Sequence, residues 1–107
     1  MDALEKHLNI NTLLSHYREL LTEKQKTIMH YYYEENFTLK EIAENENISR
    51  NAVHDQLQKT VKKLEDLEEK LGLVKKSRKR MEIIEAMKDR CKDEELSKLI
   101  ESLEKVE

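Results

Sequence analysis

Apolar residues recur three and four positions apart through most of the chain, which is the spacing of one face of an α-helix. The first such stripe contains Leu13, Leu14, Tyr17, Leu20 and Leu21. Residues 9–12, three of which are polar, precede it, and we expect a break or the N-cap region of the helix there. The chain has no proline and one glycine, so it lacks the turn chemistry that β-hairpins need. The pattern therefore predicts an all-α protein.

Polar residues predict where the next helices begin. Thr22 with Gln25, and Thr38 with Glu41, have the spacing of capping boxes, in which two side chains bond each other's backbone N–H groups. The inner face of the helix after the first box should consist of Ile28, Met29 and Tyr32, and it could include Tyr33. Successive helical residues are about 100° apart, so the run 31–33 of three tyrosines cannot all face inward. For the outermost tyrosine, packing at the rim of the core is favoured over stacking on nucleic-acid bases.

A long helix follows, from Arg50 to Leu71, and it is about 33 Å long at ~1.5 Å per residue. Its apolar seam steps by four and three residues, with one polar position. The seam consists of Val53, Leu57, Thr60, Leu64, Leu67 and Leu71. A three-helix core is too short to cover all of it. Gly72 then offers a stop or a hinge.

The C-terminal third carries two further apolar stripes. One contains Met81, Ile84, Met87 and Cys91, and the other contains Leu96, Leu99, Ile100, Leu103 and Val106, with Asp93 as the N-cap between them. We therefore expect a helix-turn-helix domain over residues 1–72 and a helical arm over residues 73–107. The arm could pack on the long helix or on a partner, including a second copy in a homodimer.

Composition indicates the cellular compartment in which the protein is expected. Charged residues make up 40% of the 107 positions and the net charge is −3. No apolar run approaches the ~20 residues of a membrane span, and the N-terminus lacks the apolar block of a signal peptide. Cys91 is the only cysteine, so no intrachain disulfide can form. A cytoplasmic protein is expected, with Cys91 as a half-buried packing residue rather than a redox centre.

Residues 38–53 have the pattern of a helix-turn-helix, with a short helix, a turn at Asn47 and a second helix capped by Ser49. With Val53 and Leu57 facing inward, polar and basic side chains face outward. Arginine, asparagine and glutamine can make paired hydrogen bonds to purine edges, and lysines attract phosphates. The predicted nucleic-acid-binding residues are Ser49, Arg50, Asn51, His54, Gln58, Lys59, Lys62 and Lys63. Asp55 interrupts this set, because its carboxylate repels phosphates.

A second basic run could also hold phosphates, or could equally be a solvated helix face. It consists of Lys75, Lys76, Arg78, Lys79 and Arg80. The four histidines show no spacing typical of metal ligands, and nothing resembles a nucleophile elbow or a phosphate-binding loop. We therefore expect neither a metal, a cofactor, nor enzymatic activity.

The segment 21–64 resembles region 4 of sigma factors through Glu41-Ile42-Ala43, Ile48-Ser49 and Val53. The run 49–55, followed by a long helix and a charged helical tail, is more similar to the YlxM-like family of small bacterial proteins. That resemblance covers residues from about 8 to 103.

Members of the YlxM-like family are encoded beside the genes for the signal recognition particle GTPase and its receptor. The resemblance therefore implies a regulator of that targeting pathway, with the particle's small RNA, its GTPase or the receptor as partner. A DNA-binding transcription regulator and a protein-interaction module without nucleic acid remain the alternatives.

Overall fold

The computed structural model describes residues 2–106, which form helices and no strand. The all-α prediction is confirmed. The chain divides into two compact units, one ending at Leu71 and one beginning at Gly72. We call them the N-terminal unit and the C-terminal hairpin.

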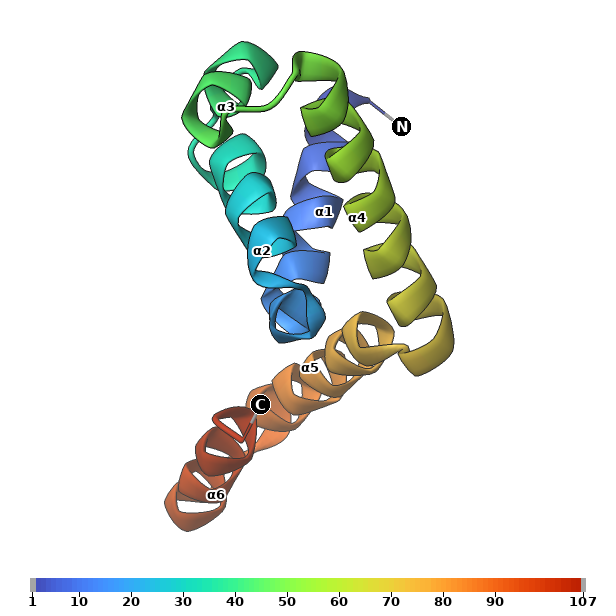
Figure 1. Cartoon of the computed structure of the whole chain (residues 1–107). Coiled ribbons are helices and arrows are strands. Elements are labelled where there is room, and N and C mark those ends of the chain that lie inside the picture. The colour runs from blue at the N-terminus through green and yellow to red at the C-terminus, as the bar shows by residue number, and fades with distance from the viewer. Residues whose placement is uncertain (1, 107) are drawn as a thin grey trace. The chain divides into compact units, whose positions relative to one another are not determined.

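The N-terminal unit contains four α-helices and two short turns of other helical types (Figure 1). These are α1 (Ala3–Tyr17), the 3₁₀ turn η1 (Arg18–Leu20), α2 (Glu23–Met29), the π-helical turn η2 (His30–Glu34), α3 (Leu39–Glu46) and α4 (Arg50–Leu71). Helix α4 packs against α1, α2 and α3. It therefore organises the core of this unit.

Helix α1 begins earlier than the sequence predicted. It runs without a break through residues 9–12, and its N-cap is Asp2, whose side chain accepts a hydrogen bond from the N–H of Glu5. Ile10 is buried within the supposed polar break. The Thr12 hydroxyl bonds the Leu8 carbonyl, so this polar side chain is accommodated inside the helix. The predicted break or N-cap region at residues 9–12 is therefore wrong.

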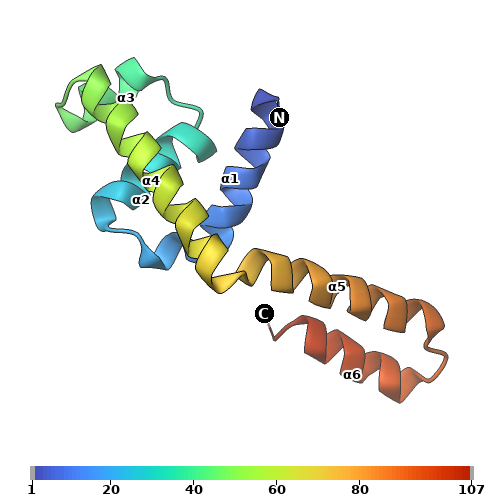
Figure 2. The ribbon, with the colours of Figure 1, turned by 90° about the vertical axis from the view of Figure 1, so that its right-hand side faces the viewer.

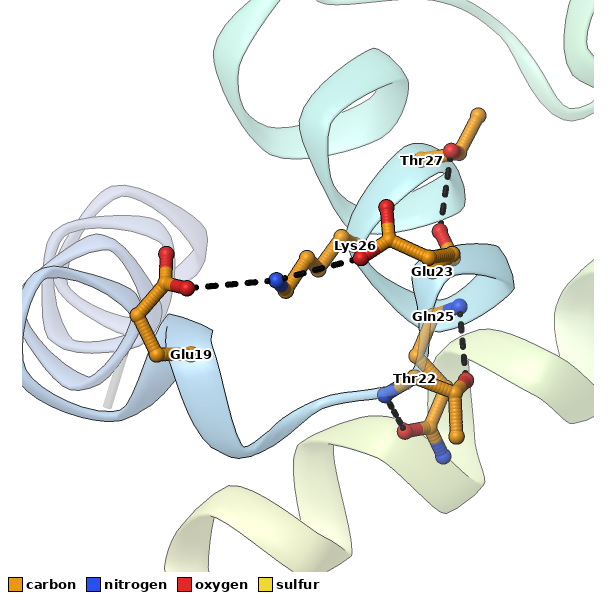
Figure 3. A network of polar contacts seen from close by, with 6 residues as sticks. All are labelled: Glu19, Thr22, Glu23, Gln25, Lys26 and Thr27. Atoms are coloured by element: carbon orange, nitrogen blue, oxygen red, sulfur yellow. Dashed lines mark hydrogen bonds and ion pairs between the residues drawn. The ribbon is translucent and has the colours of Figure 1, made fainter.

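Helix α2 begins with the predicted capping box (Figure 3). The N–H of Thr22 donates to the Gln25 side chain at 2.9 Å, and the N–H of Gln25 donates to the Thr22 hydroxyl at 3.2 Å. Lys26 lies between Glu19 and Glu23, 3.4 Å from a carboxylate oxygen of each. These contacts set the direction in which the chain leaves η1 and enters α2.

The three consecutive tyrosines lie in and around the π-helical turn, and all are half-buried. Tyr31 stacks on Phe37, with ring centroids 4.9 Å apart. Tyr33 packs against the His7 ring, and its carbonyl oxygen lies 2.8 Å from His7 Nε2. These tyrosines pack at the rim of the core, which was the arrangement favoured for the outermost one, whereas Tyr32, expected on the buried face, is only half-buried. The π-helical geometry itself was not predicted.

The seam of α4 is buried over most of its length. Val53, Leu57, Thr60 and Leu64 are buried. The Thr60 hydroxyl donates a hydrogen bond to the Gln56 carbonyl, so this polar side chain has a partner. Leu71, at the end of the seam, remains 44% exposed. The helix ends at Gly72, whose φ of +62° is a left-handed conformation that glycine adopts readily.

The C-terminal hairpin consists of α5 (Leu73–Arg90) and α6 (Glu94–Glu104), which lie side by side (Figure 2). Asp93 caps α6 as predicted, and the Cys91 thiol donates to the Asp93 carbonyl. Lys88 of α5 forms an ion pair with Glu104 of α6. Among residues 2–106, none of the helices has the length and apolar character to span a membrane.

Candidate nucleic-acid interface

The turn between α3 and α4 has the predicted geometry. Asn47 adopts a left-handed conformation with φ of 56° and ψ of 46°, and the N–H of Ile48 bonds the Ala43 carbonyl. The Ser49 hydroxyl then accepts the N–H of Ala52 at 3.0 Å, which caps α4. Asparagine tolerates the left-handed region better than most residues, so it can replace the glycine often found in such turns. The chain thus enters α4 with the start of that helix exposed.

The predicted recognition residues project from α4 toward solvent. Seven of them are exposed, and Lys63 is half-buried. The exposed ones are Ser49, Arg50, Asn51, His54, Gln58, Lys59 and Lys62. The first four, together with Leu39 of α3, line a shallow open hollow at the start of α4. The structure therefore gathers half of the predicted set in one place.

The lysines form a second surface farther along α4. Lys59, Lys62, Lys63 and Lys70 line another shallow hollow with Asp66. Lys59, Lys63 and Lys70 are spaced by four and seven residues, so they follow one flank of the helix. The predicted residues thus occupy two adjoining surfaces of one helix, which we call the reading surface (49–54, with Gln58) and the lysine flank (59–70).

Two of the lysines have partners. Lys63 donates to the Gln25 side chain at 3.3 Å, so it faces α2 more than the sequence predicted. Lys62 lies 3.9 Å from Asp66, one turn further along the same helix. Because the Lys62–Asp66 pair is exposed to solvent, it is weak. Among the three predicted lysines, Lys59 is therefore better placed to meet a phosphate than Lys62 or Lys63.

Most side chains of the reading surface, and that of Lys59 in the lysine flank, make no contact that would have to be broken for a ligand to bind. Within residues 2–106, no hydrogen bond or ion pair engages the side chains of Arg50, Asn51, His54, Gln58 or Lys59. By contrast, Arg18 of the same unit forms a 2.6 Å ion pair with Glu34. Polar groups without a partner in the protein can bond a ligand without first breaking a contact within the protein. Exposed Asp55 lies between the two surfaces and opposes an anionic ligand.

A third hollow lies beside the reading surface, and the sequence did not predict it. The hollow is lined by Lys6, Tyr32 and Tyr33 together with His54 and Gln58. Burial, followed by the neighbouring Tyr32 hydroxyl, raises the pKa of Tyr33 above its ordinary value. No local sequence signal links Lys6 to α4, because only tertiary packing brings α1 beside it.

The second basic run lies on α5, in the C-terminal hairpin. All five of its side chains are exposed, namely Lys75, Lys76, Arg78, Lys79 and Arg80. Lys75 and Arg80 already take part in interactions within the chain. The two predicted basic surfaces thus belong to different units. Across the described residues, no three histidine, cysteine or acidic side chains come together as a metal site.

Helix α3, the left-handed turn at Asn47 and the capped helix α4, which packs on α3 and exposes a polar face, have the arrangement of a helix-turn-helix protein. The match to known families extends over residues 4–106. The chain belongs to the family described as "Putative helix-turn-helix protein, YlxM / p13 like".

Full-length relatives support this assignment. The chain is 43% identical to the UPF0122 protein YlxM of Bacillus subtilis over 109 residues, covering 98% of this chain and 99% of the relative. It is 44% identical to a UPF0122 protein of Halalkalibacterium halodurans, covering 97% and 99%. A UPF0122 protein of Geobacillus kaustophilus is 41% identical, again with 97% and 99% covered. The resemblance inferred from the sequence is thereby confirmed at the level of the family.

Proposed function

We propose that this chain is a regulator that binds nucleic acid through the reading surface of α4, with the lysine flank adding sequence-independent attraction. The observation that carries the proposal is that Arg50, Asn51, His54, Gln58 and Lys59 are exposed on the first half of a capped helix, and that their side chains have no partner within residues 2–106. These side chains include the types that bond purine edges and phosphates.

The geometry favours contact at the first turns of α4. The exposed backbone N–H groups at a helix N-terminus, such as that of Arg50, attract an anion. Arg50 can bond a phosphate or a guanine in a forked manner, whereas Lys59 acts as a point charge. Asp55 lowers the attraction, as does the overall net charge of −3. We therefore expect moderate affinity that depends strongly on salt.

The biological setting that we propose is the signal recognition particle pathway. This part of the proposal rests on the resemblance to the YlxM-like family and its association with the genes of that pathway. The nucleic acid would then be the particle's small RNA, with the GTPase or its receptor as a protein partner. The basic run of α5 would supply a second phosphate contact.

The test is a titration of labelled ligands, read by fluorescence anisotropy at two salt concentrations. The ligands are the particle's RNA, a duplex DNA and the purified GTPase. RNA binding that weakens with salt supports the proposal, and preference for palindromic DNA would instead indicate a transcription regulator. Binding of the GTPase alone, with neither nucleic acid bound, would leave a protein-interaction module.

A matched pair of variants makes the test specific. Arg50→Ala with Lys59→Ala should weaken RNA binding and reduce the slope of log affinity against log salt by about 1 to 2. Lys24→Ala with Lys92→Ala removes the same charge from exposed positions elsewhere and should leave both quantities nearly unchanged. Equal effects of the two pairs would show that only net charge matters and would contradict the proposed surface.

A further inference from the structure

The C-terminal hairpin leaves a row of apolar side chains exposed on α6. Leu96, Leu99 and Leu103 are 49%, 66% and 44% exposed, and Val106 continues the row at 79%. Their steps of three, four and three residues are the repeat of a coiled-coil seam. Ile100 is the residue of α6 that is buried. Helix α6 therefore has one apolar face toward α5 and a second that its own hairpin does not cover.

The exposed face continues onto α5 as a groove. Ile83, Met87 and Leu96 line this groove, and Ile83 is 52% exposed. Its remaining walls are also mainly apolar. Exposed contiguous apolar surface of this kind marks a site of protein contact. A helix with apolar residues at the same spacing could cover it.

The distribution of charge along the hairpin indicates what kind of partner would cover this face. Residues 73–80, the base of α5, hold five basic side chains and no acidic one. Residues 81–106 hold eight acidic and five basic side chains, a net charge of −3. Three consecutive acidic residues, Asp93, Glu94 and Glu95, lie at the opposite end of α5 from the basic base, where α6 begins.

We propose that the hairpin face is a homodimer interface, occupied by the same face of a second copy in antiparallel orientation. A two-fold axis through the apolar middle would pair Ile83, Leu96 and Leu99 of the two protomers. It would also place the basic base of each α5 beside the acidic tip of the other hairpin. A two-fold interface must be complementary to itself, and the charge along this hairpin meets that requirement, because one end is basic and the other is acidic.

The first test is the oligomeric state of the full chain, measured by sedimentation equilibrium over a range of concentrations. The wild type should be a dimer. Leu99→Glu should raise the dimer dissociation constant by about 100-fold, because the interface would have to bury a carboxylate from each copy. Leu4→Glu is the matched control, since Leu4 is 68% exposed on α1, and it should remain a dimer. A monomeric wild type, or a dimer that tolerates Leu99→Glu, would overturn the proposal.

The second test identifies the occupant through charge. Lys76→Glu, Arg78→Glu and Lys79→Glu together change the net charge of residues 73–80 from +5 to −1 and so make both ends of the hairpin acidic, whereas Glu94→Lys with Glu95→Lys makes both ends basic. Each variant should dissociate, because like charges would meet across the interface. An equimolar mixture of the two should form a heterodimer. Circular dichroism checks that each variant is still helical. Failure of the folded variants to associate on mixing would overturn the antiparallel arrangement.

Discussion

The Tyr17 hydroxyl donates a 2.5 Å hydrogen bond to the carboxylate of Glu68 and so joins α1 to α4 across 51 positions of sequence. Tyr17 is fully buried. Hydrogen bonds to charged groups stabilise folded proteins more than neutral ones do. This contact holds the later turns of α4 against α1, and thereby helps to fix the direction of the helix that carries the reading surface.

Removing that hydroxyl should destabilise the N-terminal unit. Tyr17→Phe keeps the ring and is expected to lower the free energy of unfolding by about 1 to 2 kcal/mol, measured by urea denaturation. Tyr31→Phe is the control, because the Tyr31 ring stacks on Phe37 and remains half-buried. It should change stability by less than about 0.5 kcal/mol. Equal losses would mean that the Tyr17 hydrogen bond has no special role.

The left-handed turn at Asn47 should accept glycine but not a β-branched residue. Asn47→Val is expected to cost about 1 to 2 kcal/mol, because a side chain branched at Cβ is strained at a φ of 56°. Asn47→Gly should be nearly neutral, or slightly stabilising. Thermal unfolding of both variants gives the comparison. Asn45→Val, on the exposed side of α3, controls for valine itself. A stable Asn47→Val would contradict the turn geometry.

The capping box of α3 should make stability sensitive to acid. The backbone N–H of Thr38, followed by its side chain, lowers the pKa of Glu41 below the ordinary value of 4.5. A carboxylate with a lowered pKa stabilises the fold above that ordinary value, and this stabilisation disappears as pH falls through the folded pKa. Lowering the pH below 4.5 should therefore decrease the thermal unfolding temperature of Glu41→Gln by less than that of the wild type. Parallel curves for the two proteins would contradict this.

Asp55 should weaken nucleic-acid binding in the wild-type protein. It is exposed between the reading surface and the lysine flank, where it repels phosphates. Asp55→Asn is expected to raise affinity for RNA or DNA by about two- to threefold at low salt, and by less at high salt. Asp89→Asn makes the same change on exposed α5 and should have a smaller effect. An unchanged or lower affinity in Asp55→Asn would place the ligand elsewhere.

Local sequence signals predicted the parts of this fold that depend on neighbouring residues. The Thr22 and Thr38 capping boxes, the Asn47 turn and the Ser49 cap each follow from residues within four positions. The exposed side of α4 could be predicted as well, since the positions of Val53 and Leu57 determine which residues face outward.

Features that depend on tertiary contacts could not be predicted in the same way. Helix α1 continues through residues 9–12 because Ile10 is buried against the rest of the unit, which outweighs the weak helix propensity of its polar neighbours. The π-helical turn His30–Glu34 has no sequence signature of its own. Lys63 faces Gln25 because α2 packs beside α4, a contact between residues 38 positions apart.

The most direct test of the proposed interface is an NMR titration of the ¹⁵N-labelled chain with the signal recognition particle RNA. We expect the largest shift changes on the backbone amides of Arg50 and Asn51 and on the side-chain amides of Asn51 and Gln58. Changes confined to other helices, with these signals unmoved while RNA is bound, would contradict the proposed interface.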